Sequence, residues 1–168
     1  LFIMEKTSTV IEDRKKKIDR LREMNINPYP AGYKCDLKAV EAVEKFGNID
    51  GEELEKHTTT YSLAGRIMSM RIFGKAAFIH IKDSSGMIQA YIRKDRVGDE
   101  GYQLFKLMDI GDYVGIRGSF FKTKTDELTI IAREIQLLTK SVRPLPEKWH
   151  GLTDIETRYR QRYVDLIV

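Results

Sequence analysis

The chain has 168 residues, 42% of them hydrophobic and 32% charged, which suits a globular chain built around one main core. Its formal net charge of +4 permits a polyanionic partner without requiring one. The single cysteine excludes an internal disulfide, and no apolar run approaches the ~20 residues that span a bilayer, so we expect a cytoplasmic chain with no membrane segment.

The first part of the chain, residues 1–58, is expected to form a helical extension. Thr9 begins a Thr-x-x-Glu spacing typical of a capping box, and one helical stripe of apolar residues follows it. The members of that stripe are Ile11, Ile18, Leu21 and Met24. Asp36 is placed to cap a second helix that ends near Phe46, and a third short helix is expected over 51–56.

One face of the first predicted helix is basic. The cations on it are Arg14, Lys15, Lys16, Lys17, Arg20 and Arg22. Such a face is often only solvated surface. The rival interpretation is that the cations contact phosphates, with Lys15, Lys16 and Lys17 as the candidates, and both interpretations stay open at this point.

From Tyr61 onward the pattern changes to that of β-strands, in which apolar and polar residues alternate between short breaks. We expect a short helix between the third and fourth strands, and the five strands over 61–72, 76–83, 87–94, 112–123 and 128–138. Three strands, a helix and two strands is the order of an OB-fold, a five-stranded Greek-key barrel. An SH3-like barrel or an open α+β sheet would share much of this pattern.

Glycines within the predicted strands favour the barrel. Gly65, Gly115 and Gly118 are unfavourable in a flat strand, but they suit points where a strongly curved strand bends or bulges. We therefore predict a mainly β fold, in which a five-stranded OB-fold barrel over residues 59–140 follows the N-terminal helices.

The last part of the chain, residues 141–168, is expected to be a linker followed by a helix. Pro144 and Pro146 stiffen the linker, and Thr153 begins a second capping-box spacing. An aromatic and aliphatic stripe then steps by four residues, through Ile155, Tyr159, Tyr163 and Ile167. Because this stripe has no C-cap, we interpret 141–168 as a linker and the truncated start of a further domain.

The sequence shows no constellation of catalytic residues. It contains no glycine-rich phosphate loop, no HExxH and no nucleophile motif around Ser or Cys. His57, His80 and His150 stand far apart in different predicted elements. We therefore expect no catalytic residue and no metal site in this chain.

The second and third predicted strands place unusual side chains on their water-facing side. Alternation turns Phe78 outward on the second strand, and Gln89 and Tyr91 outward on the third. Aromatic rings can stack on unpaired bases, and an amide can donate to and accept from a base edge. This face of an OB-fold commonly binds single-stranded nucleic acid. The alternative is that the N-terminal helices cover Phe78 as a satellite core.

Several cations lie close to these residues in the predicted hairpin. Those that could contact phosphates or stack on bases are Arg71, Lys75, Lys82 and Arg93. Strict alternation from Leu63 and Ile67 would turn Arg71 inward, so an outward Arg71 requires a β-bulge or the end of the hairpin.

Three stretches of the sequence carry a resemblance to a known family: GKAAFIHIKDSSGMIQAYIRKD, GDYVGIRGSFFKTKTDELTIIAREIQLLTKSVRPLPEK and WHGLTDIETRYRQRYVDL. The first stretch fits the aspartyl-, asparaginyl- and lysyl-tRNA synthetases, which share an OB-fold anticodon-binding domain. The other two are more specific. From about Arg20 to Val168 the chain resembles the N-terminal part of bacterial class II lysyl-tRNA synthetases, with the first class II catalytic motif beginning near Thr153.

The resemblance implies anticodon-binding roles for four residues. Phe78 matches the aromatic residue that stacks on the central anticodon uridine, and Gln89 matches the glutamine that reads the edge of that base. Arg71 matches an arginine that contacts the same nucleotide, and Glu134 matches an acidic residue that lines the anticodon pocket. Met70 stands where the family would fit an additional arginine, which puts one phosphate contact in doubt.

The resemblance also implies a parent protein that is a homodimeric ligase, with ATP and Mg²⁺ bound in a catalytic domain beyond this chain. We therefore expect the chain itself to bind the anticodon stem-loop of a lysine-accepting tRNA, to hold no cofactor and to catalyse nothing alone. Two other functions stay open. One is a free-standing OB-fold that binds single-stranded nucleic acid, and the other is a protein-interaction module that uses the aromatic face and the apolar tail.

Overall fold

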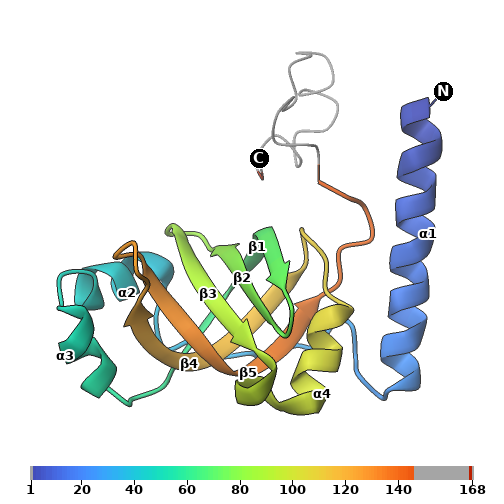
Figure 1. Cartoon of the computed structure of the whole chain (residues 1–168). Helices are drawn as coiled ribbons and strands as arrows, with labels where there is room; N and C mark the ends of the chain where they lie inside the picture. Colours follow the sequence, from blue (N-terminus) through green and yellow to red (C-terminus); the bar gives the residue numbers. More distant parts are fainter. Residues whose placement is uncertain (1, 146–166, 168) are drawn as a thin grey trace.

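The computed structural model describes residues 2–145 and 167, and it contains a closed five-stranded barrel with helices around it (Figure 1). The elements are α1 (Phe2–Glu23), α2 (Ala39–Phe46), α3 (Gly51–Lys56), β1 (Tyr61–Phe73), β2 (Ala76–Lys82), β3 (Met87–Arg93), α4 (Lys94–Lys106), β4 (Tyr113–Lys122) and β5 (Leu128–Thr139). The predicted fold class is confirmed, and each strand begins and ends within one residue of its expected position.

The strands follow one another around the barrel in the order β1-β2-β3-β5-β4, and β4 pairs with β1 to close it. All neighbouring strands are antiparallel except β3 and β5, which are parallel over Thr129–Ile131. A parallel pair needs a long crossover connection. Here α4 and β4 provide it, and Figure 1 shows α4 at one end of the barrel.

Alternation along the strands fills the barrel with branched aliphatic side chains. Residues that point inward and are at most 2% exposed include Ile67, Ile79, Ile92, Ile116 and Ile130. β-Branched side chains pack well on a pleated surface, so the strands both favour and fill this interior.

Strand β4 contains a β-bulge at Gly118, where the strand bends as part of the closed barrel. The register between β4 and β5 shifts between Arg117 and Gly118, and a Cβ at Gly118 would collide with the carbonyl oxygen of Ile131. A bulge bends the strand and increases its twist. The expectation that strand glycines mark bends of a barrel is confirmed at this position.

Two predicted helix caps are wrong. Helix α1 begins at Phe2, so Thr9 lies inside it, because no helix-breaking residue precedes Thr9. Helix α2 begins after Lys38, and its Ala39 N–H donates to a carboxylate oxygen of Asp83 at 2.7 Å. Asp36 instead accepts a 2.7 Å hydrogen bond from the backbone N–H of Ser62 and ties the chain to β1.

A charged cluster fixes α1 beside the barrel, close to the end of β5. It consists of Arg14, Lys17, Asp109, Asp112 and Lys140. The ammonium group of Lys140 is fully buried and donates to Asp109 and, at 2.7 Å, to Asp112. Lys17 of α1 donates to the other oxygen of Asp109 at 2.5 Å.

Arg14 adds main-chain contacts to this cluster. Its guanidinium group donates to the carbonyl oxygens of Ile110 at 2.9 Å, Ser141 at 3.0 Å and Arg143 at 3.3 Å. Burial by itself would raise the pKa of Asp109, but the hydrogen bonds from Lys140 and Lys17 outweigh it and hold the pKa below its ordinary value. Helix α1 is thus held at the point where the chain leaves the barrel.

Most of the predicted tail lies outside the described residues. This applies to the helix expected from Thr153 and to its apolar stripe, except for Ile167. Among the residues that are described, no helix is long and apolar enough to cross a membrane.

Candidate nucleic-acid interface

Strand register places three of the predicted residues in one outward row. Arg71 of β1 lies opposite Phe78 of β2, and Phe78 lies opposite Tyr91 of β3. Directly paired residues of neighbouring strands point to the same face. Arg71 reaches this face because the β1–β2 register shifts between Ile67 and Ser69, which is the bulge that an outward Arg71 requires.

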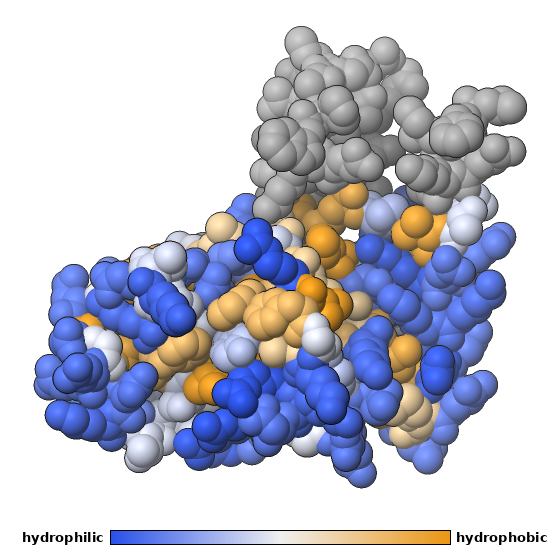
Figure 2. Space-filling model, viewed as in Figure 1, coloured by the Kyte–Doolittle hydropathy of each residue, from blue (hydrophilic) through white to orange (hydrophobic). Residues whose placement is uncertain are grey.

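Aromatic rings continue along this face, and we call Phe73, Phe78, Tyr91 and Phe121 the aromatic row. The rings of Phe78 and Tyr91 stack with centroids 4.5 Å apart and planes inclined by 19°. The ring centroid of Phe73 lies 5.6 Å from that of Phe78, and the ring centroid of Phe121 lies 6.0 Å from that of Tyr91. Figure 2 shows hydrophobic side chains gathered over the β2–β3 side of the barrel, with hydrophilic side chains around them.

Phe78 does not belong to the main core. Its side chain is half-buried, it is not part of the core cluster, and its ring neighbours are Phe73 and Tyr91 of the aromatic row. The sequence pattern missed Phe73, which ends β1 and is 43% exposed. Its position beside Phe78 and its exposure give the row a second ring that is open to a base.

Gln89 lies one row further along β2 and β3, opposite His80, and it is 9% exposed. Its Nε2 donates to Glu127 Oε2 at 2.9 Å, and its Oε1 accepts from the Thr129 hydroxyl at 2.9 Å. The Nε2 atom of His80 lies 3.1 Å from the other carboxylate oxygen of Glu127. Ser69 of β1 extends this hydrogen-bond network, because its hydroxyl oxygen lies 2.9 Å from His80 Nδ1.

Glu127 is held in place by the turn between β4 and β5. Its backbone N–H donates to the Thr123 hydroxyl at 3.2 Å, and its carbonyl accepts from the Thr123 N–H at 3.1 Å. Sequence reasoning missed Glu127 because it lies 38 positions from Gln89. The signal available was the fold itself, since the loop between strands 4 and 5 of an OB-fold borders the binding face.

The acidic residue predicted for the anticodon pocket, Glu134, lies elsewhere. It follows the stretch of β5 that pairs with β3 and sits opposite Arg117 of β4, 3.8 Å from its guanidinium group. The structure therefore brings Arg71, Phe78 and Gln89 together and leaves Glu134 outside this group.

Cations border the aromatic row in two hollows. A hollow of about 690 Å³ beside Tyr91 is lined by Lys75 and Arg93, and Arg93 also forms a 2.7 Å ion pair with Asp95. A second hollow, of about 440 Å³, lies against Tyr91 and Phe121. Its guanidinium groups come from Arg93, Arg96 and Arg133. Lys82, near the end of β2, is exposed, and its ammonium lies 3.4 Å from the carbonyl oxygen of Ile167.

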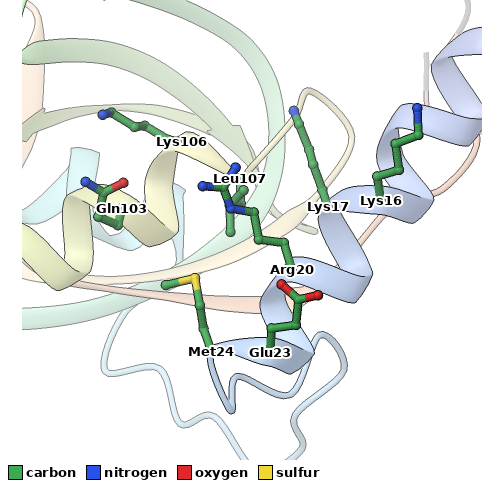
Figure 3. A pocket seen from close by; sticks show the side chains of 8 residues that line it. All are labelled: Lys16, Lys17, Arg20, Glu23, Met24, Gln103, Lys106 and Leu107. Carbon is green, nitrogen blue, oxygen red and sulfur yellow. The ribbon is translucent and has the colours of Figure 1, made fainter.

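The three candidate lysines of α1 have different surroundings. Lys15 is exposed, and Lys16 is exposed with Asp13 3.6 Å away, whereas Lys17 is bound to Asp109. Figure 3 shows Arg20 extending from α1 toward the end of α4 near Leu107, and Lys17 projecting from the preceding turn of α1. Together with Lys16 and Lys106 they line a groove of about 720 Å³ that also contains Glu23.

This face has the chemistry of a binding surface. Its rings can stack on bases, the amide of Gln89 can exchange hydrogen bonds with a base edge, and the surrounding cations can meet phosphates. Within the described part of the chain, no group of three or more His, Cys, Asp or Glu side chains is arranged to hold a metal ion.

A family described as an OB-fold nucleic acid binding domain matches residues 61–138. The matched residues form the OB-fold barrel, and they cover all five strands from the start of β1 to one residue before the end of β5.

Whole-chain similarity extends beyond the OB-fold domain. The lysine–tRNA ligase of Anaeromyxobacter sp. strain K is 50% identical over 159 residues, 95% of this chain and 31% of that protein. The lysine–tRNA ligase of Bacillus cytotoxicus is 51% identical over 154 residues, 92% of this chain and 31% of that protein. The resemblance to the N-terminal region of bacterial lysyl-tRNA synthetases is confirmed, and the chain spans 31% of the length of these curated relatives.

Proposed function

We propose that this chain binds the anticodon loop of a lysine-accepting tRNA, with the central uridine stacked on Phe78 and its edge read by Gln89. The observation that carries the proposal is the register of β1, β2 and β3. It puts Arg71, Phe78 and Tyr91 in one outward row and Gln89 in the next. The name lysine–tRNA ligase, which the relatives carry, supplies the identity of the RNA.

The proposal assigns a different task to each part of the face. Phe78, backed by Tyr91, offers a ring for the base, and Arg71 lies beside it for the sugar–phosphate chain. Lys75 and Arg93, and more distantly Lys15, Lys16, Lys17 and Lys82, offer positive charge to the rest of the loop and stem. Uridine stacks weakly on its neighbours, so little stacking energy is lost when it turns outward onto a protein ring.

Aminoacylation is a proposal for a whole protein longer than this chain, because the chain spans 31% of the relatives it matches. In that proposal, ATP and Mg²⁺ act in a catalytic domain, and two copies of the whole protein form a homodimer. The part of this chain is to bind the tRNA and to place it for that domain.

The test is the affinity of the chain for short anticodon stem-loops that differ only in the central loop base. We expect the uridine loop to bind most tightly, with discrimination of about 1–3 kcal/mol for a pair of edge contacts. Gln89→Ala should remove most of this discrimination and weaken overall binding less. Gln136→Ala, which alters an exposed glutamine of β5 opposite Gly115, is the matched control and should bind like the parent chain.

Other outcomes would support the remaining functions. Equal binding to RNA and to single-stranded DNA of the same sequence would favour a general single-strand binder, since only RNA carries the 2′-hydroxyl. No binding of either nucleic acid at low salt would favour a protein-interaction module. Equal losses on every loop in Gln89→Ala would remove Gln89 as the residue that reads the base.

A further inference from the structure

A glutamine can discriminate uridine from cytidine only if its amide is held in one orientation. The amide has two N–H donors on one side and a carbonyl acceptor on the other. Uridine presents an N3–H donor beside the O4 acceptor, whereas cytidine presents the N3 acceptor beside an N4 amino donor. The order of donor and acceptor is therefore reversed, and an amide free to turn over would pair with both bases.

The structure holds the Gln89 amide from two sides. Glu127 Oε2 accepts from Nε2 at 2.9 Å, and the Thr129 hydroxyl donates to Oε1 at 2.9 Å. Turning the amide over would bring Oε1 against the Glu127 carboxylate, which has no proton to donate when ionised. The same turn would leave the Thr129 hydroxyl with only the backbone carbonyl oxygen of Glu127, at 3.1 Å, as its acceptor.

His80 keeps the Glu127 carboxylate in place for this contact. Its Nε2 lies 3.1 Å from Glu127 Oε1, and its Nδ1 lies 2.9 Å from the Ser69 hydroxyl. A neutral imidazole with its proton on Nε2 satisfies both contacts, because Nε2 donates to the carboxylate and Nδ1 accepts from Ser69. Each carboxylate oxygen of Glu127 thus has its own partner, one from β2 and one from β3.

The Gln89 amide can still form hydrogen bonds with a ligand. His80 Nε2 lies 3.5 Å from Gln89 Nε2, but with its own proton directed at Glu127 it accepts no hydrogen bond from the amide. One N–H of Nε2 and one lone pair of Oε1 therefore remain after the contacts to Glu127 and Thr129 are counted. One donor and one acceptor in fixed order are what the uridine edge requires.

We propose that Thr129, a residue that is fully buried and cannot touch the RNA, is a specificity-determining residue that acts by fixing the Gln89 amide. The inference rests on the proposed function, because it concerns the base that Gln89 reads. It assigns Glu127 and Thr129 of the β4–β5 region a shared positioning role, although neither is near Gln89 in the sequence.

Thr129 gives a cleaner test than Glu127, whose side chain is 46% exposed and therefore accessible to RNA. Thr129→Val has nearly the shape of the parent residue and lacks the hydroxyl, whereas Thr129→Ser keeps the hydroxyl. Both variants are measured in the full 168-residue chain against stem-loops with uridine or cytidine at the central position. Melting temperatures show that each variant is folded.

In Thr129→Val we expect the preference for uridine over cytidine to fall by about 3- to 10-fold, the equivalent of one hydrogen bond. The change should come mainly from tighter binding of the cytidine loop. Thr129→Ser should keep the preference of the parent chain. The side-chain NH₂ resonances of Gln89 in NMR spectra should shift in Thr129→Val and stay in place in Thr129→Ser.

Two results would overturn the inference, and they are distinguishable from each other. A parent chain that prefers uridine and a Thr129→Val variant with the same preference would overturn the positioning role alone. A parent chain that binds the uridine and cytidine loops equally would overturn the proposed function and this inference with it.

Discussion

Phe78 is half-buried by other aromatic rings and lies outside the barrel interior. A substitution of Phe78 can therefore change RNA binding without changing the stability of the fold. The ring closest to Phe78 is Tyr91, at 4.5 Å, and Tyr91 in turn contacts Phe121. Removing the Phe78 ring opens a gap on the surface, whereas removing a core ring such as Phe105, which is 1% exposed, leaves a cavity. The two phenylalanines should therefore respond differently to the same substitution.

We predict that Phe78→Ala weakens binding of the anticodon stem-loop by about 1–3 kcal/mol, the contribution of one base stacked on an aromatic ring. Its melting temperature should change little. Phe105→Ala is the control and should lower the free energy of unfolding by about 3–5 kcal/mol. Unchanged affinity together with a large loss of stability in Phe78→Ala would show that the ring is structural.

For single residues, the sequence predicted the side-chain directions that follow from alternation along a strand. It missed the residues whose role depends on contacts between strands that are distant in the sequence. The outward positions of Phe78 and Gln89 follow from a period of two residues. The bulge that turns Arg71 outward shifts the period by one, and alternation alone cannot locate such a shift. Glu127 and Thr129 meet Gln89 only because β5 lies beside β3, which is a property of the closed barrel.

Among the elements, helix α1 has basic residues with two different roles: some attach the helix to the barrel, and others remain exposed. Lys17 and Arg14 point to the barrel and bind Asp109 and main-chain carbonyls, while Lys15 and Lys16 stay exposed. Their similar positions in the sequence did not reveal the difference, because the residues that Lys17 and Arg14 contact lie about ninety or more positions away. The helix itself was predictable from its apolar stripe, and Ile18 and Leu21 of that stripe are buried.

We predict that replacing Lys15 and Lys16 together by Gln weakens binding of all RNAs alike and leaves their ranking unchanged. The slope of log affinity against log salt should fall by about 0.7 for each phosphate group that the variant no longer neutralises. Melting temperature should stay close to that of the parent chain, because exposed ion pairs contribute little to stability.

Lys17→Gln is the contrasting variant, because it removes a partner of Asp109 and should lower stability. A salt dependence identical in the parent and in the Lys15/Lys16 double variant would show that this face of α1 is only solvated surface.

The charged cluster of Arg14, Lys17, Asp109, Asp112 and Lys140 acts at the scale of the whole molecule, because it joins α1, the segment before β4 and the end of β5. The pKa of Asp109 is lowered in the folded chain: burial raises it, and the hydrogen bonds from Lys140 and Lys17 lower it by more. The folded chain therefore binds fewer protons at Asp109 than the unfolded chain does. The stability that Asp109 contributes is complete above the unfolded value of about 3.9 and is lost as pH falls through the lower folded value.

We predict that Asp109→Asn lowers the free energy of unfolding by about 1–3 kcal/mol at neutral pH, the scale of hydrogen bonds to a charged group. The difference from the parent chain should shrink as the pH falls below about 4. Urea unfolding at a series of pH values measures it.

Asp19→Asn, which alters an exposed carboxylate of α1, is the control and should leave stability unchanged. A difference between Asp109→Asn and the parent chain that stays constant across the whole pH range would contradict the ion-pair explanation.

The contacts of Arg14 also bear on the order in which the molecule is assembled. Arg14 binds the carbonyl oxygen of Ser141, which lies 127 positions later in the chain. During synthesis α1 emerges from the ribosome early, and it stays without this partner until the last strand of the barrel has followed. Contacts between such distant positions form late and slow folding, because a long loop must close first. The contact between Arg14 and Ser141 can therefore form only after β5 has been made, so we expect α1 to dock on a barrel whose strands are already present.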